Sequence, residues 1–320
     1  MPRLDNSGIY ASSLTRLINM AFISKELKEN IPKPRKLFEK RQILAEPLTT
    51  NYSQQGTAFD YLLRFTIAHK NRHVIESDLV ASHVVNRRNK PTFKFTISTP
   101  FRDVAISKDI NRLELYFGKR QFLKIEEHYK KYEKEIEKYK KSGKLTTNTA
   151  KACIFFANLD IIYRAGYFEN KMPVLEKFKI DPLDVNDLMN LTKVIPNELT
   201  INSKYIILNP TFGKMSKRLP ADGDLIIGDL LIDIKTTKEC KIRSYEWNQL
   251  LGYYAFAKLG GITVGDKNKK MKINNIGIYF SRHGYLWTFN IDEYLNDNKK
   301  EWLMKFFKKY ENSEKKIPKI

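Results

Sequence analysis

Cysteine is nearly absent from this chain, because only Cys153 and Cys240 occur among its 320 residues. Two isolated cysteines cannot build the disulfide framework that stabilises small secreted domains, and their scarcity suits a reducing compartment. The ordinary role of such a cysteine is that of a small buried apolar residue. We therefore expect no disulfide framework.

Long hydrophobic runs are also missing. No stretch approaches the roughly 20 consecutive apolar residues that a membrane-spanning helix needs. Residues 1–25 likewise lack the continuous apolar segment of a secretory signal. We therefore expect a cytoplasmic protein with no membrane partner.

Acidic residues are in deficit, with 36 Asp and Glu against 57 Lys and Arg, a net charge of +21 and a pI near 9.7. Such an excess is typical of proteins that bind polyanions, nucleic acids above all. A basic composition rich in Lys, Asn, Ile and Tyr also arises in AT-rich genomes, so charge alone does not decide between the two. The 42% of hydrophobic residues is enough for a core of one large domain or two small ones.

The segment PADGDLIIGDLLIDIKTT, residues 220–237, is the most informative part of the chain. Gly228 and Asp229 suit a two-residue hairpin turn, because glycine accepts a positive φ at the first central position. This turn predicts that Asp224 lies opposite Asp233, with Cβ atoms about 4.5–5.5 Å apart. A slip of one residue would put the two carboxylates on opposite faces.

A lysine completes the polar face of the predicted hairpin. Lys235 lies two residues after Asp233, so both share one face, and Lys235 is expected opposite Asp222. The other face is predicted to be buried and carries Leu225, Ile232 and Ile234.

Two opposed carboxylates repel unless a cation lies between them. Mg²⁺ and similar hard cations take carboxylate and carbonyl oxygens, and they activate water and polarise phosphoryl groups. A neighbouring lysine can hold the attacking water or neutralise charge in the transition state. The competing interpretation is a polar strand whose Asp and Lys face solvent. Asp222 is the reserve ligand if the register differs.

These residues resemble the PD-(D/E)xK nuclease superfamily, and within it the RecB-like branch. Asp224 and the later Asp233-Ile234-Lys235-Thr236 match its acidic residue and Asp-x-Lys-Thr signature. Gln249 and Tyr253, at i and i+4 of a predicted helix, match its Gln-x-x-x-Tyr motif. Residues 56–60, GTAFD, resemble its Gly-x-x-x-His motif, with Asp60 where His is usual. The motifs cover residues 50–70 and 200–290.

The resemblance implies a role for each matched residue. Mg²⁺ or Mn²⁺ would be held by Asp60, Asp224, Asp233 and the backbone carbonyl of Ile234. Lys235 would be the catalytic lysine, and Gln249 and Tyr253 would orient it or a phosphate. Asp60 could instead pair with Arg64, four residues on, and Gln249 and Tyr253 could simply pack. Some RecB-like nucleases bind an iron–sulfur cluster through four cysteines, which two cysteines cannot supply, so we expect none.

The resemblance therefore implies a metal-dependent DNA nuclease acting in repair, recombination, phage replication or defence. Such nucleases often act beside a helicase or another protein partner. The resemblance leaves open endonuclease or exonuclease action and does not exclude RNA as substrate. One alternative is a nucleic-acid-binding module that keeps the fold without catalysis. Another is a restriction-type or RNA-directed nuclease, because specificity resides in insertions and loops.

The expected fold is α/β, with a mixed-sheet, restriction-endonuclease-like core and extensive helical N-terminal and inserted segments. We expect a mainly helical region over 1–200 that carries the first motif, and the catalytic core with a C-terminal helix over 201–320, joined in one integrated fold. The hydrophobic periodicity predicts helices over 12–28, 54–70, 119–141, 146–167, 181–191, 245–259 and 291–312.

Other segments have less distinctive patterns. Residues 205–208 and the hairpins 223–237 and 273–289 are predicted strands. Residues 71–118 are expected to hold more helix and a basic loop, 86–91, which could contact phosphate. Arg282 and His283, at the tip of the second hairpin, could touch a DNA backbone, with a plain turn as the alternative. His128, within the charged helix 119–141, receives no role.

Overall fold

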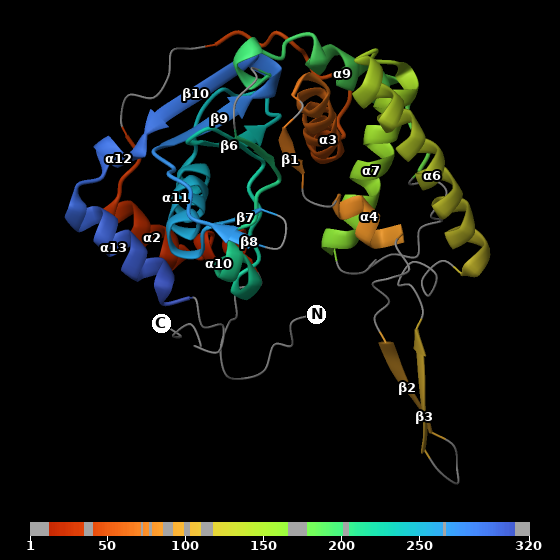
Figure 1. The fold of residues 1–320 in the computed structure, drawn as a ribbon, viewed down its shortest axis with the longest axis horizontal. Coiled ribbons are helices and arrows are strands. Elements are labelled where there is room, and N and C mark those ends of the chain that lie inside the picture. Colours follow the sequence, from red (N-terminus) through yellow and green to blue (C-terminus); the bar gives the residue numbers. More distant parts are fainter. Residues whose placement is uncertain are drawn as a thin grey trace. The chain divides into compact units, whose positions relative to one another are not determined.

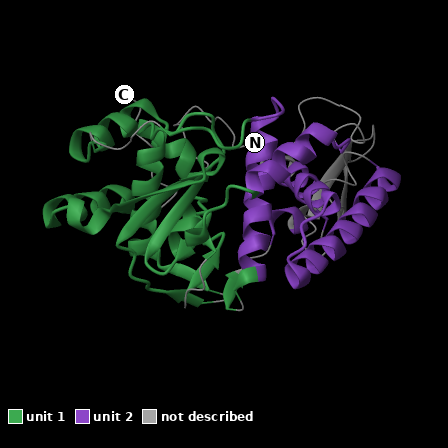
Figure 2. Cartoon of the chain, turned by 90° about the horizontal axis from the view of Figure 1, so that it is seen from above, with its two compact units in different colours: residues 1–46, 70–77, 193–320 green, residues 47–69, 78–192 purple. Residues whose placement is uncertain are grey.

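The computed structural model describes residues 13–34, 41–71, 73–76, 79–85, 92–98, 103–109, 118–165, 178–200, 205–264 and 267–310. The chain divides into two compact units (Figure 2). Unit 1 comprises residues 1–46, 70–77 and 193–320, and unit 2 comprises residues 47–69 and 78–192. The expected boundary between 200 and 201 therefore needs correction, because the first 46 residues belong with the sheet-bearing unit.

Unit 1 is built on a six-stranded mixed sheet (Figure 1). Its order is β1-β4-β5-β6-β9-β10, with β1–β4 and β6–β9 parallel and the remaining pairs antiparallel. The strands are β1 Val74–Glu76, β4 Ile206–Leu208, β5 Leu225–Ile227, β6 Leu230–Lys235, β9 Asn275–Phe280 and β10 Tyr285–Asn290. The expected α/β class with a mixed sheet is thus present.

The predicted register of the first hairpin is confirmed. Leu225 pairs with Ile232 and Ile227 with Leu230, as the two-residue turn requires. Gly228 has a φ of 61°, which glycine adopts without a steric penalty. The second hairpin, β9–β10, is also present, with Tyr285 paired to Phe280.

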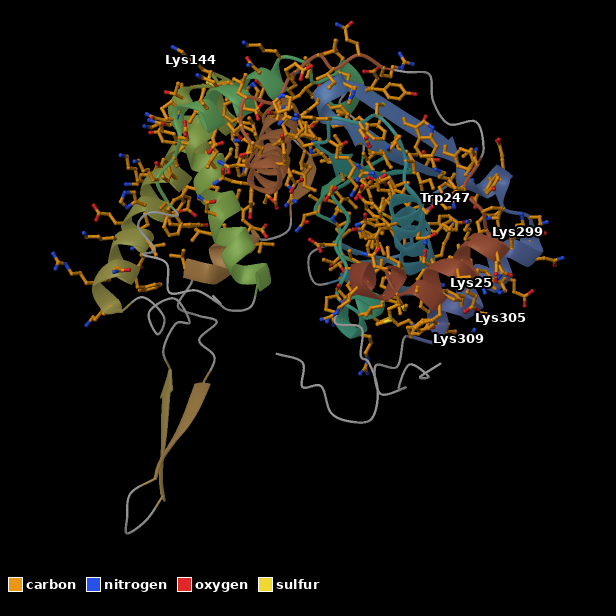
Figure 3. All side chains as sticks on the ribbon, turned by 180° about the vertical axis from the view of Figure 1, so that it is seen from behind. Lys25, Lys144, Trp247, Lys299, Lys305 and Lys309 are labelled. Carbon is orange, nitrogen blue, oxygen red and sulfur yellow. The ribbon has the colours of Figure 1, made fainter. Side chains whose placement is uncertain are left out.

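Helix α11, Ser244–Gly260, is the central helix of unit 1 and contacts strand β9. Around it pack α1 Leu14–Ile18, α2 Ala21–Asn30, α10 Gly213–Arg218 and α13 Asp297–Lys308 (Figure 1). A Cβ atom at Gly252 would lie 2.9 Å from Leu14, so glycine permits the close approach of α1. Trp247 of α11 is 1% exposed, whereas Lys305 extends outward from α13 (Figure 3). This packing places the N-terminal helices in unit 1.

Small elements complete unit 1. Helix α12, Ile291–Tyr294, precedes α13, and Asn296 caps α13 by accepting from Lys299 N at 3.0 Å. The predicted helix 291–312 is therefore two helices, and the predicted helix 12–28 is likewise divided into α1 and α2. The remaining elements are the ribbon β7 Ile262–Val264 and β8 Lys267–Lys269, and the 3₁₀ turns η2 Asn197–Leu199 and η3 Ser281–His283.

Unit 2 is mainly helical. Its helices are α3 Tyr52–Lys70, α4 Val80–Val85, α6 Lys119–Ser142, α7 Thr147–Ala165 and α9 Pro182–Thr192. The rings of Tyr61, Phe65 and Phe156 meet in its core with centroids 5.9–6.4 Å apart. The helices expected over 54–70, 119–141, 146–167 and 181–191 all form, because their apolar periodicity is long and regular.

Residues 71–118 differ from the expectation of helix and loop. They contain strand β1, helix α4 and an antiparallel pair, β2 Thr92–Ser98 and β3 Asp103–Asp109. The sequence TFKFTIS of β2 alternates β-branched and aromatic residues with polar ones, which is a strand signal that the helical expectation overlooked. The basic loop 86–91 lies outside the described residues.

Candidate active site

The carboxyl end of β6, an inner strand of the sheet, carries the predicted Asp-x-Lys pair. Lys235 Nζ lies 2.7 Å from Asp233 Oδ2, and the two side chains are only 18% and 4% exposed. The competing interpretation, a polar strand facing solvent, is therefore wrong. Two charged groups are held together where water has little access.

Asp224 lies directly before β5 and bonds across to β6. Its Oδ2 accepts from Ile234 N at 2.6 Å, between Asp233 and Lys235 in the sequence. Its backbone is held as well, because Asn209 N donates to Asp224 O at 2.9 Å. The hairpin therefore brings together both predicted carboxylates and the lysine.

Helix α11 supplies two further predicted residues. Lys235 Nζ donates to Gln249 Oε1 at 3.1 Å, and Gln249 Nε2 donates to Tyr253 Oη at 2.7 Å. The i,i+4 spacing puts Gln249 and Tyr253 on the same helix face. The result is a continuous polar chain from Asp233 through Lys235 and Gln249 to Tyr253.

The charged groups around Lys235 change the pKa of its side chain. Burial favours the neutral amine, but the nearby carboxylates of Asp233 and Asp224 outweigh it, so the pKa of Lys235 is raised. At neutral pH this side chain is an ammonium that donates hydrogen bonds and cannot serve as a base. Burial, together with the charges of Asp233 and Asp224, also raises the pKa of Tyr253, so its hydroxyl stays protonated.

Asp222 lies beyond the β5–β6 ladder, whose last pair towards it is Leu225 with Ile232, so its expected place opposite Lys235 stays a prediction. It forms an isolated antiparallel bridge with Thr211, and the next residue, Gly223, donates from N to Pro210 O at 2.9 Å. The charge of Asp222 still contributes to the raised pKa of Tyr253, which puts it within electrostatic reach of the cluster.

Glu246 was not among the predicted site residues. This residue of α11 is 2% exposed, and its charge contributes to the raised pKa of Lys235. Its carboxylate accepts from Arg243 N at 2.6 Å and from Tyr245 Oη at 3.0 Å. The signal was its position three residues before Gln249, which puts both on neighbouring parts of one helix face.

Asn209 is a second overlooked residue. It has a φ of 52°, which is unusual for a residue other than glycine but is tolerated by asparagine. This conformation directs its N–H to the backbone of Asp224. No local sequence pattern distinguishes this asparagine from those in ordinary turns.

Asp60 lies in unit 2, on α3, whereas the other predicted site residues lie in unit 1. Arg64 Nε donates to Asp60 Oδ1 at 3.0 Å, and Arg64 Nη2 donates to Asp60 Oδ2. The competing role considered for Asp60, a helix ion pair, is therefore present. Its role as a metal ligand stays a prediction.

The donor set suits a hard divalent cation. Asp224, Asp233 and the Ile234 carbonyl are oxygen donors, and Mg²⁺ commonly binds through one or two carboxylates, water and substrate phosphate. Within the described ranges, no group of three or more His, Cys, Asp or Glu side chains is arranged to hold a metal ion. The described part of unit 1 therefore offers two carboxylates and a carbonyl rather than a complete protein cage.

Arg282 and His283 are buried, at 0% and 5% exposure. Arg282 Nη1 donates to Ala45 O at 3.1 Å, and Arg282 O accepts from Leu44 N and Ala45 N. A contact between Arg282 and a DNA backbone is therefore excluded in this structure. The turn instead anchors residues 44–45, and Ser281 Oγ donates to Thr236 Oγ1 at 2.9 Å, next to Lys235.

Two global observations bear on function. No described helix is both long and apolar enough to cross a membrane. Cys153 is buried in α7 and Cys240 is partly buried, and both are free thiols.

Comparisons with protein-family models, with curated proteins and with solved structures found no match to this chain. Function is therefore inferred from the residues and their geometry.

Proposed function

We propose that the chain is a Mg²⁺- or Mn²⁺-dependent DNA nuclease whose unit 1 is a restriction-endonuclease-like, PD-(D/E)xK core. One observation carries the proposal. Lys235 Nζ contacts Asp233 of the same strand at 2.7 Å and Gln249 of α11 at 3.1 Å. Asp224, from the other side of the hairpin, accepts a hydrogen bond from Ile234 N, next to Lys235. The three motifs that carry the resemblance in unit 1 thus meet at one point.

Charge balance supports a cation at this point. Asp233, Asp224 and Glu246 all act on the ammonium of Lys235, so several carboxylates are gathered around one positively charged side chain. A buried ion pair contributes little net stability, and buried titratable clusters are more frequent at functional sites than elsewhere. A divalent cation would offset the negative charge of these carboxylates.

Each residue then has a defined task. Asp224, Asp233 and the carbonyl of Ile234 would hold the cation, which when bound polarises the phosphoryl oxygen and lowers the pKa of a water molecule. The Lys235 ammonium would orient the attacking water and offset charge on the phosphoryl oxygens. Gln249 and Tyr253 would hold Lys235 in place. In-line attack would leave 5′-phosphate and 3′-hydroxyl ends, as the resemblance implies.

Asp60 is the proposed additional ligand. Because its carboxylate is bonded to Arg64, it would have to exchange this guanidinium for the cation. A helicase or other protein partner and a cytoplasmic location remain part of the proposal through the resemblance and the composition alone.

Cleavage assays test the proposal directly. Wild type and Lys235→Ala are incubated with circular single-stranded, linear double-stranded and supercoiled DNA, in Mn²⁺ or EDTA. Lys305→Ala is the matched control, because Lys305 is a 72% exposed lysine of the same unit. We expect Mn²⁺-dependent cutting by wild type and the control but not by Lys235→Ala. Full cutting by Lys235→Ala would refute the assignment, and absence of cutting by any form with DNA binding intact would favour the binding-module alternative.

A further inference from the structure

Unit 2 contains a cleft that the proposed nuclease chemistry does not use. It lies between α6, α7 and residues 178–180 and has a volume of about 500 Å³. Helices α6 and α7 run side by side (Figure 1), and residues of both helices line the cleft. This volume lies within the range of roughly 300–1,000 Å³ that is usual for small-molecule and cofactor sites.

Aromatic rings form one side of the cleft. Phe155 is 2% exposed, and the rings of Tyr132 and Phe178 lie with their centroids 5.1 Å from its own. The exposed ring of His128 is stacked towards Phe155, with a centroid separation of 6.3 Å and planes 28° apart. His128 is fixed in this orientation, because its Nδ1 lies 2.8 Å from Lys124 O. The cleft therefore offers flat faces on which another planar ring can stack.

Lysine side chains are the other chemical feature of the cleft. Lys124, Lys151 and Lys179 line it, one from each of the three segments, and no carboxylate is among the described lining residues. None of the three takes part in an ion pair in the described part of the chain. Other lysines of α6 do, since Lys130 contacts Glu126 at 3.2 Å and Lys138 contacts Glu135 at 2.8 Å. The described lining of the cleft thus carries positive charge and no negative charge.

We propose that this cleft binds one nucleotide of a single-stranded nucleic acid. The base stacks on the rings of His128 and Tyr132, which the buried ring of Phe155 supports from behind, and the flanking phosphates contact Lys124, Lys151 and Lys179. Stacking on aromatic rings combined with basic side chains along the backbone is the usual chemistry of single-strand binding. A duplex does not fit, because its bases present no free face.

The proposal is independent of catalysis, because it concerns residues of unit 2 alone and needs no metal. Its test therefore uses the full chain in EDTA. The affinity of a fluorescent 12-nucleotide single-stranded DNA is measured by anisotropy over a series of salt concentrations. The same is done with a duplex of equal length, and with an unlabelled 5′-mononucleotide as competitor.

Two variants carry the test. In the first, Lys124, Lys151 and Lys179 are all changed to Gln, and the matched control changes Lys134, Lys138 and Lys141 to Gln. The control lysines lie on α6 beside Glu133 and Glu137 rather than in the cleft, and the charge lost is the same. The second variant is His128→Ala, at an exposed position that does not contribute to the core.

We expect the cleft variant to bind single-stranded DNA at least about tenfold more weakly than the control variant. Its salt dependence should fall by about 2 in log–log slope, since each lost phosphate contact in a single strand accounts for roughly 0.7. His128→Ala should weaken binding about fivefold or more through lost stacking. Duplex affinity should change equally in the cleft and control variants.

Three results would overturn the proposal. Equal effects of the cleft and control variants would mean that only net charge matters. Unchanged binding by His128→Ala, whose folding is verified by circular dichroism, would remove the stacking site. Saturation of the cleft by the mononucleotide with unchanged oligonucleotide binding would assign the cleft to free nucleotides instead.

Discussion

Each of the two units contains a partly or fully buried carboxylate next to a positively charged side chain, but the two arrangements differ. In unit 2, both oxygens of Asp60 receive N–H groups of Arg64, one turn along the same helix. In unit 1, Asp224 and Asp233 come from two strands and both act on Lys235. The first arrangement balances one negative charge with one positive charge. The second gathers carboxylates from separate segments around one lysine, as we propose for a metal site.

Asp233→Asn should have the largest effect, because it keeps the shape of the side chain and removes its charge. We expect cleavage to fall at least about 100-fold, because changing even the partners of metal ligands commonly reduces activity 10–100-fold. Folding and DNA binding should persist, as circular dichroism and anisotropy would reveal. Metal-dependent activity close to that of wild type would remove Asp233 from the site.

Asp60→Asn tests the other arrangement. If Asp60 exchanges Arg64 for the cation, as proposed, Mn²⁺ affinity by calorimetry and the cleavage rate should both fall about 10–100-fold. Arg64→Gln is the companion variant, because it removes the charged partner and leaves Asp60. It should mainly lower the free energy of unfolding, by about 1.5–3 kcal/mol. An Asp60→Asn enzyme that is destabilised but fully active would assign Asp60 to the ion pair alone.

Tyr253→Phe tests whether Tyr253 positions Lys235 through Gln249, because it removes only the hydroxyl that accepts a hydrogen bond from Gln249. We expect a reduction of about tenfold in kcat with little change in KM, since Lys235 loses part of its support. Tyr254→Phe is the matched control on the same helix, where the hydroxyl donates to Asp292 Oδ1 at 2.6 Å. Equal activities of the two variants would exclude a positioning role for Tyr253.

The smallest effect concerns acid stability. Burial raises the pKa of Asp292, but the hydrogen bond from Tyr254 and the charges of Lys258 and Lys300 outweigh it, so the pKa lies below its ordinary value of 3.8. A lowered folded-state pKa contributes stability above the unfolded value, and this is lost as the pH falls through the folded value. The difference in unfolding free energy between wild type and Tyr254→Phe should therefore shrink below about pH 4, by less than about 1 kcal/mol. Urea unfolding at pH 7 and pH 3 measures it, and a difference independent of pH would exclude this linkage.

Local features were predictable from the sequence for physical reasons. The hairpin register follows from a two-residue turn and the twofold alternation of a strand, both of which are short-range. The shared face of Gln249 and Tyr253 follows from helical geometry. The long helices of unit 2 were predictable from their apolar periodicity, whereas β2, β3 and the division of the terminal helices were not anticipated.

Only the tertiary structure decided how these local pieces meet. The docking of α11 on the sheet brings Gln249 to Lys235, fourteen positions apart in sequence, and buries Glu246 nearby. The fully buried Arg282 depends on residues 44–45, a contact across 237 positions. The assignment of α1 and α2 to unit 1 likewise depends on their packing against α11. The sequence by itself determined which groups share a strand or a helix face, because those relations need only local geometry. Their burial, their partners and the balance of charge around them depend on long-range packing, which local patterns do not encode.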